Sequence, residues 1–472
     1  MRIAFISPFF PLKGGISRFS GLLADELQAK GHAVQRSGFK KLFPSFLVRG
    51  HSPEAPEHTA ETTVKSAQGA HGTASVQGAS GTASIKSAPG TASEKDAVSV
   101  ASVQGASGTA SIQGASGTAS IQGASGTASI QGASGTASIK SASGTASEKD
   151  AVSVVSIHSL VLYNPFSWLS LLHSLKRGRP DVLLFAYWTG LLAPLLFTVR
   201  RLSGIRTVVL LHNLSTHEPF VLEPFLRKLL LASADGFITL SREVADALAA
   251  AGNTKPVASL YHPPYPPGPP LSGSARPEKS RARRSLGYEG DVPVLLFFGY
   301  VRRYKGLDLL LRAMPEVLAA FPDARLLVAG QFYEPESGYR ELIGRLGIAG
   351  SVDLRSGYAS DRDTARYFAA ADAAVLPYRQ ASQSGVVQLA YGYGLPVIVT
   401  PAGGLAAEVE QGRTGWIAGA ITPEAIAAAV TGFLRDGGRP AMEQGVREYA
   451  GVHSWERFAG EAASFIRSVA HR

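Results

Sequence analysis

Residues 294–308 of this 472-residue chain read VLLFFGYVRRYKGLD. The apolar run Val294–Phe298 has the length and composition of a buried strand, and the loop after it leads into a helix predicted at 307–319. A strand followed by a loop and a helix is the repeating unit of a parallel sheet. The stretch therefore predicts an α/β fold, in which strands and helices should alternate on either side of it.

The alternation continues through the C-terminal half. Strands are predicted at residues 325–328, 351–354, 373–377 and 396–399, with helices at 338–346, 364–370, 385–391 and 423–435. A final helix is predicted at 455–469 and has no strand after it. Residues 291–452 are therefore expected to form a Rossmann-like domain, followed by a C-terminal helix at 453–472.

The N-terminal half has the same pattern, interrupted by an insertion. Strands are predicted at 2–6, 32–36, 182–186, 207–211 and 236–240, and helices at 17–30, 168–175, 220–232 and 242–250. These segments predict a second Rossmann-like domain, made of residues 1–58 and 158–265. A proline-rich stretch at 263–270 leads into a linker predicted at 266–290. The predicted fold class is α/β, with two Rossmann-like domains facing across a cleft.

Residues 59–157 differ in composition from the rest of the chain. They contain no Phe, Trp or Tyr, and Gly-Thr-Ala-Ser recurs in a nine-residue register. Each repeat offers one Val or Ile for burial, which is too little to offset the entropy of ordering the chain. The favoured interpretation is a low-complexity, disordered insertion in the N-terminal domain. The alternative is a small β-solenoid, because a fixed period with one aliphatic residue per turn can stack.

Composition and charge exclude several classes of protein. With 45% hydrophobic and 17% charged residues the chain is not wholly disordered, and the lack of cysteine excludes disulfides and thiolate sites. The net charge of +10 fits anionic substrates or an anionic membrane, whereas the pattern of basic residues does not favour nucleic acid. Residues 182–199 carry no charge, but Thr189-Gly190 interrupts them. A buried strand and a helix are therefore favoured over a membrane span.

Basic residues and a helix start offer places for phosphate groups. Arg302 and Lys305 lie three residues apart where a loop opens a helix, and fixed cations beside free backbone N–H groups suit a diphosphate. A solvated basic turn is the alternative. Ser382 or Ser384 can cap the helix that begins near Gly385 and leave N–H groups for phosphate oxygens, although an ordinary N-cap has the same sequence.

Two glycine pairs and a histidine follow other predicted strands. Gly14-Gly15 comes after the first strand, and Gly403-Gly404 comes after the strand at 396–399. Each pair would let the backbone approach a ligand closely. His212 ends the strand at 207–211, where a functional role is favoured over simple burial.

These pieces, in this order, resemble glycosyltransferase family 4, whose members have the GT-B fold of two Rossmann-like domains. In the C-terminal half the resemblance runs through residues 297–308, 328–330, 370–378, 383–385, 394–398, 403–405 and 412–416. In the N-terminal half it is sparser and runs through residues 11–16, 212–213 and 234–241. The resemblance implies a glycosyltransferase whose substrate is a nucleotide diphosphate sugar.

The resemblance also implies roles for individual residues. Arg302 and Lys305 match the cations that neutralise the donor diphosphate, and His212 matches a histidine near the transferred sugar; these three are the catalytic candidates. Gly14 and Gly15 match the loop of the N-terminal domain that faces the same phosphates. The other donor-binding candidates are Gln383, Ser384, Gly385, Gly403, Gly404 and Glu408.

Two departures from the family pattern bear on sugar recognition. Members commonly carry two glutamates before Gly-x-Pro, and the matching positions here are Ala381 and Leu389. The glutamate that usually follows Gly-Gly-x-x falls on Ala407, with Glu408 one place later. Recognition of the sugar hydroxyls is therefore expected to differ from that of the family.

The expected activity is transfer of a sugar from a nucleotide diphosphate sugar to an acceptor hydroxyl with retention of configuration, in glycan or lipid-linked saccharide synthesis. No carboxylate pair stands where a double displacement would need it. No metal or other cofactor is expected, because Asp361 and Asp363 stand at a helix start and favour capping. The alternatives are a catalytically inactive GT-B binding or scaffold protein and a polymerase of the glycogen-synthase type.

The expected partners are the sugar donor and a glycan or lipid-linked acceptor, without nucleic acid. A cytoplasmic location is predicted, with peripheral contact to the inner face of an anionic membrane. Lys40 and Lys41 adjoin an apolar stretch at 42–47. Further basic residues lie at the ends of apolar helices of the same domain, namely Arg200, Arg201, Arg227 and Lys228.

Overall fold

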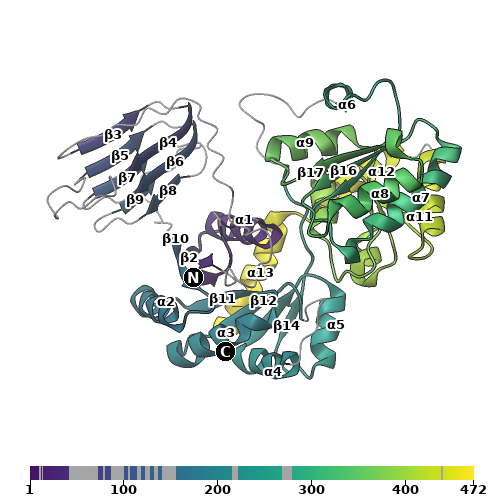
Figure 1. Ribbon diagram of the computed structural model, residues 1–472. Coiled ribbons are helices and arrows are strands. Elements are labelled where there is room, and N and C mark those ends of the chain that lie inside the picture. The colour runs from purple at the N-terminus through teal and green to yellow at the C-terminus, as the bar shows by residue number, and fades with distance from the viewer. Residues whose placement is uncertain are drawn as a thin grey trace. The chain divides into compact units, whose positions relative to one another are not determined.

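The computed structural model describes residues 1–9, 12, 14–41, 73–77, 80–86, 100–104, 107–113, 118–122, 128–131, 137–140, 156–214, 222–267, 279–436 and 439–471. The chain divides into two compact units, Met1–Pro44 with His158–Arg472, and Ser45–Ile157. The first unit contains two parallel sheets, each covered by helices (Figure 1). The predicted pair of Rossmann-like domains is confirmed.

The N-terminal sheet has the strand order β10-β2-β1-β11-β12-β13-β14, and the pairs from β2 to β14 are parallel. Every residue of β11 (Val182–Tyr187) and β12 (Thr207–Leu211) is buried, as expected for central strands with both faces covered. The other strands are β1 (Arg2–Ile6), β2 (Ala33–Lys41), β10 (Ser156–Val161), β13 (Gly236–Thr239) and β14 (Val257–Ser259).

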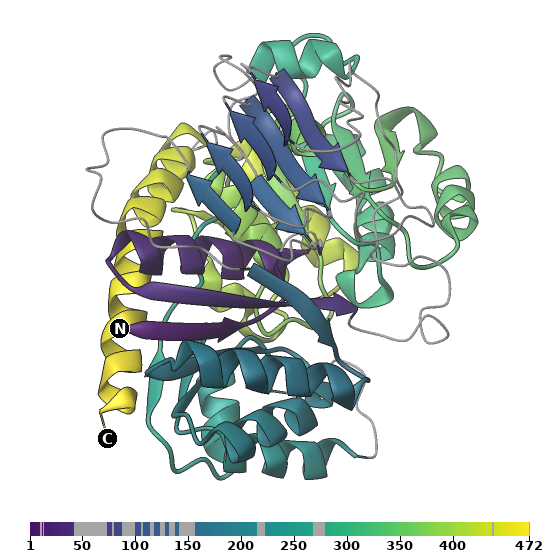
Figure 2. The ribbon, with the colours of Figure 1, turned by 90° about the vertical axis from the view of Figure 1, so that its left-hand side faces the viewer.

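Helices cover both faces of this sheet. One face packs against α2 (Pro165–Gly178), α3 (Ala193–Ser203), α4 (Glu223–Ser233) and α5 (Arg242–Ala250). The other face packs against α1 (Gly15–Ala29) and the last helix of the chain, α13 (Trp455–Ala470). Figure 2 shows α13 (yellow) crossing α1 (purple), and the two helices are in contact, so the last helix completes the N-terminal domain.

The uncharged run at 182–199 forms β11, a short 3-10 turn η1 (Gly190–Leu192) and the first half of α3. This agrees with the favoured interpretation of a strand followed by a helix. In the described parts of the chain, no helix is both long enough and apolar enough to cross a membrane.

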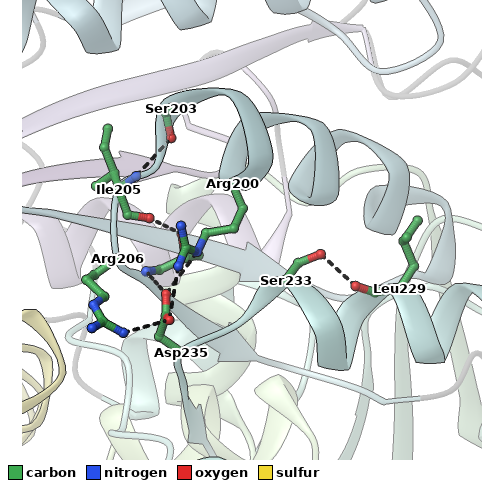
Figure 3. Close-up of polar contacts among 8 residues, drawn as sticks. Arg200, Ser203, Ile205, Arg206, Leu229, Ser233 and Asp235 are labelled. Atoms are coloured by element: carbon green, nitrogen blue, oxygen red, sulfur yellow. Dashed lines mark hydrogen bonds and ion pairs between the residues drawn. The ribbon is translucent and has the colours of Figure 1, made fainter. Parts of the chain in front are cut away.

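An ion-pair cluster joins β12 to β13 at their amino ends (Figure 3). Asp235, which precedes β13, accepts a hydrogen bond of 2.8 Å from the backbone N–H of Thr207. The same carboxylate pairs with Arg200 of α3 at 3.0 Å and with Arg206 at 3.2 Å. Two of the basic residues of this domain are therefore neutralised within the fold.

The C-terminal sheet has the strand order β17-β16-β15-β18-β19-β20, and all of its pairs are parallel. Its strands are β15 (Val294–Phe298), β16 (Arg325–Gly330), β17 (Val352–Ser356), β18 (Ala373–Leu376), β19 (Val397–Val399) and β20 (Gly415–Ile417). The helices are α7 (Leu307–Ala320), α8 (Glu336–Arg345), α9 (Asp361–Ala370), α10 (Gly385–Gly392), α11 (Pro423–Arg435) and α12 (Arg439–Val452), with 3-10 turns η2 (Arg303–Lys305), η3 (Ala349–Ser351) and η4 (Gly403–Glu408).

The predicted linker at 266–290 needs a correction, because it contains a helix, α6 (Lys279–Ser285), that packs on α9. Arg283 of α6 is buried, and its guanidinium donates to both carboxylate oxygens of Asp372 at 2.7 and 2.8 Å. A polar Arg/Ser sequence resembles a linker, but here the buried arginine is compensated by a bidentate ion pair. This part of the linker therefore belongs to the C-terminal domain.

In the second unit the described residues are seven strands in two parallel sheets: β3 (Thr73–Gln77), β5 (Val100–Gln104), β7 (Thr118–Gln122) and β9 (Ala137–Lys140); and β4 (Ser80–Lys86), β6 (Ser107–Gln113) and β8 (Ala128–Gln131). Equivalent repeat residues pair in register, as Ser111 does with Ser129 and Ser120 does with Ser138. The rest of 59–157 lies outside the described residues, so the disordered insertion favoured for this segment and the β-solenoid alternative both stay predictions. Identical repeats can stack in register, so that each strand continues the hydrogen-bond ladder of the one before.

Candidate active site

The strand order of the C-terminal sheet predicts where a ligand binds. Successive strands β15, β16 and β17 run to one side, and β18, β19 and β20 run to the other, so the order reverses between β15 and β18. Ligands of such sheets bind beyond the carboxyl ends of the strands at this reversal. The loops at 299–306 and 377–384 follow these two strands, and they contain four of the predicted site residues, Arg302, Lys305, Gln383 and Ser384.

Lys305 belongs to the first of these loops and contacts the second. Its side chain is buried, and its ammonium group lies 5.1 Å from the centre of the Tyr378 ring, on the loop after β18. Burial lowers the pKa of Lys305. Among the described residues, no carboxylate forms an ion pair with this ammonium group, so the site holds a buried cation without its own anion.

Arg302 has a different environment from Lys305. It is exposed, and its guanidinium lies over the ring of Tyr333 at 4.2 Å from the ring centre. It is thus held by an aromatic side chain from the loop after β16. The two predicted cations come from one loop, and one of them is buried while the other is exposed.

Glu408 lies at the first turn of α10. Its carboxylate accepts hydrogen bonds from the backbone N–H of Ser384 at 2.9 Å and from Nε2 of Gln388 at 3.0 Å. Burial raises the pKa of Glu408 to about 8, against the opposing effect of these two hydrogen bonds. Ser384 caps the helix by accepting from the N–H of Val386 at 3.2 Å. Glu408 and Ser384, both candidates from the sequence, are therefore direct neighbours.

Tyr265 connects the starts of α1 and α10, and sequence reasoning missed it. Its hydroxyl donates to the carbonyl of Gly15 at 3.0 Å, and a Cβ at Gly385 would lie 3.7 Å from its ring. Its backbone N–H donates to the carbonyl of Gln388 at 3.0 Å. The available signal was a buried-type aromatic residue among the prolines of the linker. The contact brings the glycine loop of the N-terminal domain next to α10.

His212 is buried at the carboxyl end of β12. Its ring meets the ring of Phe19 edge-on, with 5.2 Å between ring centres, and the part of the chain that the structure describes offers its Nε2 no hydrogen-bond partner. Burial, reinforced by the nearby His262, lowers the pKa of His212 to about 3, so the ring is neutral at physiological pH. The carbonyl of His212 accepts a hydrogen bond of 2.9 Å from Nε2 of Gln383. The structure therefore brings these two candidates from different domains together.

Gly403 and Gly404 lie against protein rather than open space. A Cβ at Gly403 would collide with the carbonyl of Ala381, and one at Gly404 would collide with the carbonyl of Ser382 and the carboxylate of Glu243. The glycine pair thus allows η4 to pack against the loop before α10 and to place Glu408. Whether it also contacts a ligand stays a prediction.

Three buried polar atoms around α10 have no hydrogen-bond partner among the described residues. They are Nε2 of His212 and the Oε1 atoms of Gln383 and Gln388. A buried polar atom without a partner costs about 1–3 kcal/mol, and such atoms gather where a ligand supplies the missing partner. Beside an uncompensated lysine, this set suits a ligand with several hydroxyl groups and an anionic group.

The structure does not bring Asp361 and Asp363 into this site. They lie in the first turn of α9, as expected of acids at a helix start, but the N-cap is Ser360, whose hydroxyl accepts from the N–H of Asp363 at 3.1 Å. In the described parts of the chain, no group of three or more His, Asp or Glu could hold a metal ion.

Two family models match the two halves of the chain. The model described as "Glycosyl transferases group 1" matches residues 292–436, and the model described as "Glycosyltransferase Family 4" matches residues 142–263. Together they cover more than half of the chain. The chain belongs to glycosyltransferase family 4. The expected transferase class and GT-B fold are thereby confirmed.

Individual relatives of this glycosyltransferase agree with that assignment. The D-inositol 3-phosphate glycosyltransferase of Thermobispora bispora is 29% identical over 63% of this chain and 72% of that protein. D-inositol 3-phosphate glycosyltransferase 2 of Catenulispora acidiphila is 35% identical over 43% of this chain and 50% of that protein. The alignments thus span between one half and about seven tenths of these relatives.

A solved structure supports the fold. HepE of Anabaena, crystallised with UDP and with UDP-glucose, superposes with TM-scores of 0.56 and 0.54. In the UDP complex the sequences are 18% identical, and the superposition covers 67% of this chain and 86% of HepE.

Proposed function

We propose that this glycosyltransferase moves a sugar from a nucleotide diphosphate sugar to an acceptor hydroxyl. The observation that carries the proposal is the buried, uncompensated Lys305 at the strand-order reversal, beside the start of α10. HepE, which shares the fold, was crystallised with UDP and UDP-glucose, which supports the same class of donor.

The leaving diphosphate is assigned to Lys305, Arg302 and the first turn of α10. Among the described residues the N–H of Gly385 donates to no other group, so it is available to a phosphate oxygen. Fixed cations and N–H groups stabilise charge that develops on a leaving group without reorganising. Gly14 and Gly15 face the same region through Tyr265.

The transferred sugar is assigned to the neutral groups Gln383 and His212. The Oε1 of Gln383 can accept from a sugar hydroxyl, and the Nε2 of His212 can accept or donate according to its tautomer. These groups replace the family glutamates that are missing at Ala381 and Leu389. We propose retention at the anomeric carbon, with a diphosphate oxygen taking the acceptor proton.

The acceptor is proposed to be a hydroxyl of a glycan, a lipid-linked saccharide or an inositol phosphate. The last choice rests on the names of the curated relatives. We further propose a cytoplasmic protein in peripheral contact with an anionic membrane, supported by the net charge of +10. No metal or other cofactor is part of the proposed reaction.

Saturation-transfer NMR with UDP-, GDP- and ADP-sugars tests the donor assignment. The proposal expects saturation transfer to the protons of one nucleotide sugar and competition by the matching nucleoside diphosphate. Binding of none of them would remove the basis of the assignment. Binding without turnover on any acceptor would instead favour the inactive scaffold alternative.

A further inference from the structure

Arg379 makes three kinds of contact with the segment that contains Lys305. Its backbone N–H donates to the carbonyl of Tyr304 at 2.7 Å. Its guanidinium donates to the carbonyl of Arg303 at 2.8 Å and to the two carboxylate oxygens of Asp308 at 2.8 and 2.7 Å. Arg379 belongs to the loop after β18, whereas its partners belong to the η2 turn after β15 and to the first turn of α7. One side chain therefore joins the two loops that flank the strand-order reversal.

These contacts fix the backbone on both sides of Lys305. The two residues that precede it are the ones whose carbonyls accept hydrogen bonds from Arg379. The residue that follows it, Gly306, has a φ of +67°, and a Cβ there would collide with the carbonyl of Pro377. The backbone that leads to Lys305 and away from it is thus held against the loop after β18.

The loop after β18 is itself a fixed support. Thr400, which directly follows β19 and is buried, donates from its hydroxyl to the carbonyl of Tyr378 at 2.5 Å. The backbone N–H of Thr400 donates to the carbonyl of Leu376 at 3.3 Å. The ring of Tyr378 contacts the ammonium group of Lys305, and the next residue is Arg379. Two successive side chains of this loop therefore contact the ammonium group of Lys305 and fix the backbone that carries it.

The buried ammonium group of Lys305 gives this clamp a physical reason. Burial of a cation is unfavourable, and the described residues supply no carboxylate that would offset it here. A lysine has a flexible four-carbon stem and a strongly hydrated charge, so on a mobile loop its ammonium group would turn toward water. The ion pair between Arg379 and Asp308 restrains the loop without adding net charge. Arginine suits this role because its planar guanidinium can bind a carboxylate and a carbonyl at the same time.

Asp308 is ionised, as a charged clamp requires. Burial alone would raise the pKa of Asp308, but the bonds from Arg379 outweigh this effect and lower the pKa below its ordinary value. Asp308 also lies in the first turn of α7, where a negative charge is favourable. The pair is therefore charged at neutral pH.

We propose that Arg379, paired with Asp308, is a positioning residue of the transfer reaction and holds the ammonium group of Lys305 inside the site. The inference rests on the proposed function, in which Lys305 stabilises the leaving diphosphate. Arg379 touches no reacting atom in this proposal, and its effect on the reaction passes through Lys305. Displacement of a reacting group by about 1 Å can lower a rate by about 10²-fold, so loss of the clamp should be visible in turnover.

A double-mutant cycle, measured by steady-state kinetics, tests whether Arg379 acts through Lys305. Arg379→Ala should lower kcat by about 10- to 100-fold, and Arg379→Lys, which keeps the charge, should lose less. Adding Arg379→Ala to Lys305→Ala should lower kcat by no more than about two-fold further, whereas a merely structural role would make the two losses multiply. The matched control is Arg340→Ala, which removes an arginine that pairs with Glu336 within α8, and it should turn over as wild type does.

Acylation of Lys305 by an amine-specific reagent, followed by mass spectrometry, tests the clamp without any substrate. Lys305 should react about ten-fold faster in Arg379→Ala than in wild type, and also faster in Asp308→Asn, with the exposed Lys255 as the reference. Unchanged labelling in both variants, or kinetic losses that multiply, would overturn the clamp while leaving the transferase assignment intact. A wild-type protein that transfers no sugar would instead contradict the proposed function, and the labelling would still decide whether Arg379 holds Lys305.

Discussion

Lys305 and Arg302 have different surroundings, and this difference decides how each side chain affects stability and anion binding. Both are basic and belong to one loop, yet Lys305 is buried with no anionic partner in the described parts of the chain, whereas Arg302 lies exposed against Tyr333. A buried cation without a partner is unfavourable to the fold, because its desolvation is not offset. Such a residue is expected to support binding of an anion at a cost in stability, and the two effects can be measured separately.

Substitution Lys305→Ala should lower turnover while leaving the protein at least as stable as wild type. Losing one preorganised group at a leaving group lowers turnover by about 10²–10³-fold. Removal of an uncompensated buried charge should not lower the free energy of unfolding. Steady-state kinetics and urea unfolding measure both. The control is Arg303→Ala, an exposed neighbour; similar kinetic losses in both variants would contradict the role of Lys305.

The lowered pKa values of the buried histidines lead to a second prediction at the scale of single residues. Burial lowers the pKa of His212 to about 3 and that of His262 to about 4. Each ring is neutral in the folded protein, so the unfolded chain binds more protons as the pH falls below about 6.5. Their contribution to stability is therefore complete above pH 6.5 and is lost as the pH falls toward 4.

His262→Gln should flatten the dependence of unfolding free energy on pH in this window. The slope should differ from wild type by about 1.4 kcal/mol per pH unit between pH 6 and 4.5. Urea unfolding at four pH values measures it, and comparing slopes cancels groups that titrate in the opposite sense. Exposed His173→Gln is the control, and parallel slopes for wild type and His262→Gln would disprove the neutral buried ring.

At the scale of elements, hydrophobic periodicity predicted the helices and strands that have a clear apolar pattern and missed those that lack one. β12, β15 and α5 have the predicted bounds, because their apolar residues follow a clear period. β14 is only three residues long, and α6 has a polar sequence whose buried arginine depends on an ion pair. Neither feature leaves a periodic pattern.

The site residues that could be predicted from the sequence are those that follow a predicted strand. Lys305 and His212 could be chosen because each follows a predicted strand, which fixes the edge of the sheet where it lies. The bond between Glu408 and Ser384 could not be predicted, since it joins two loops 24 residues apart. Tyr265 was missed because it lies among prolines, in a stretch that has the composition of a linker. Contacts of this kind depend on tertiary packing, which local periodicity does not contain.

The packing of the linker on α10 gives a prediction for one element. A Cβ at Gly392 would collide with the backbone carbonyl of Tyr265, so Gly392→Ala must displace the linker or the helix. Overpacking of this kind costs about 1–3 kcal/mol. Gly344→Ala in α8 is the control, because that glycine has open space and alanine favours helix. Thermal unfolding should rank Gly392→Ala below wild type and Gly344→Ala at or above it; the reverse order would contradict this packing.

At the scale of the whole molecule, the candidate site is built from contacts between the two Rossmann-like domains. The contacts that assemble it join His212 to Gln383, Gly15 to Tyr265 and Glu408 to Ser384. All lie in the unit made of Met1–Pro44 and His158–Arg472. The strands of the repeat belong to the other unit.

Deletion of residues 66–154 should therefore leave a folded protein that still binds its donor. The deletion retains β10, which pairs into the N-terminal sheet. Circular dichroism and donor titration by calorimetry would measure the outcome, with full-length protein as the reference. Loss of the cooperative unfolding transition, or of donor binding, would mean that the repeat supports the first unit.

The central claim is that the site transfers sugar from a nucleotide diphosphate donor. The most direct measurement follows wild-type enzyme by proton NMR, with UDP-, GDP- and ADP-sugars and with D-inositol 3-phosphate or a lipid-linked saccharide as acceptor. The account predicts acceptor-dependent release of nucleoside diphosphate and a product with the same anomeric configuration as the donor. A donor that binds at the site without transfer or hydrolysis, across all acceptors, would contradict it.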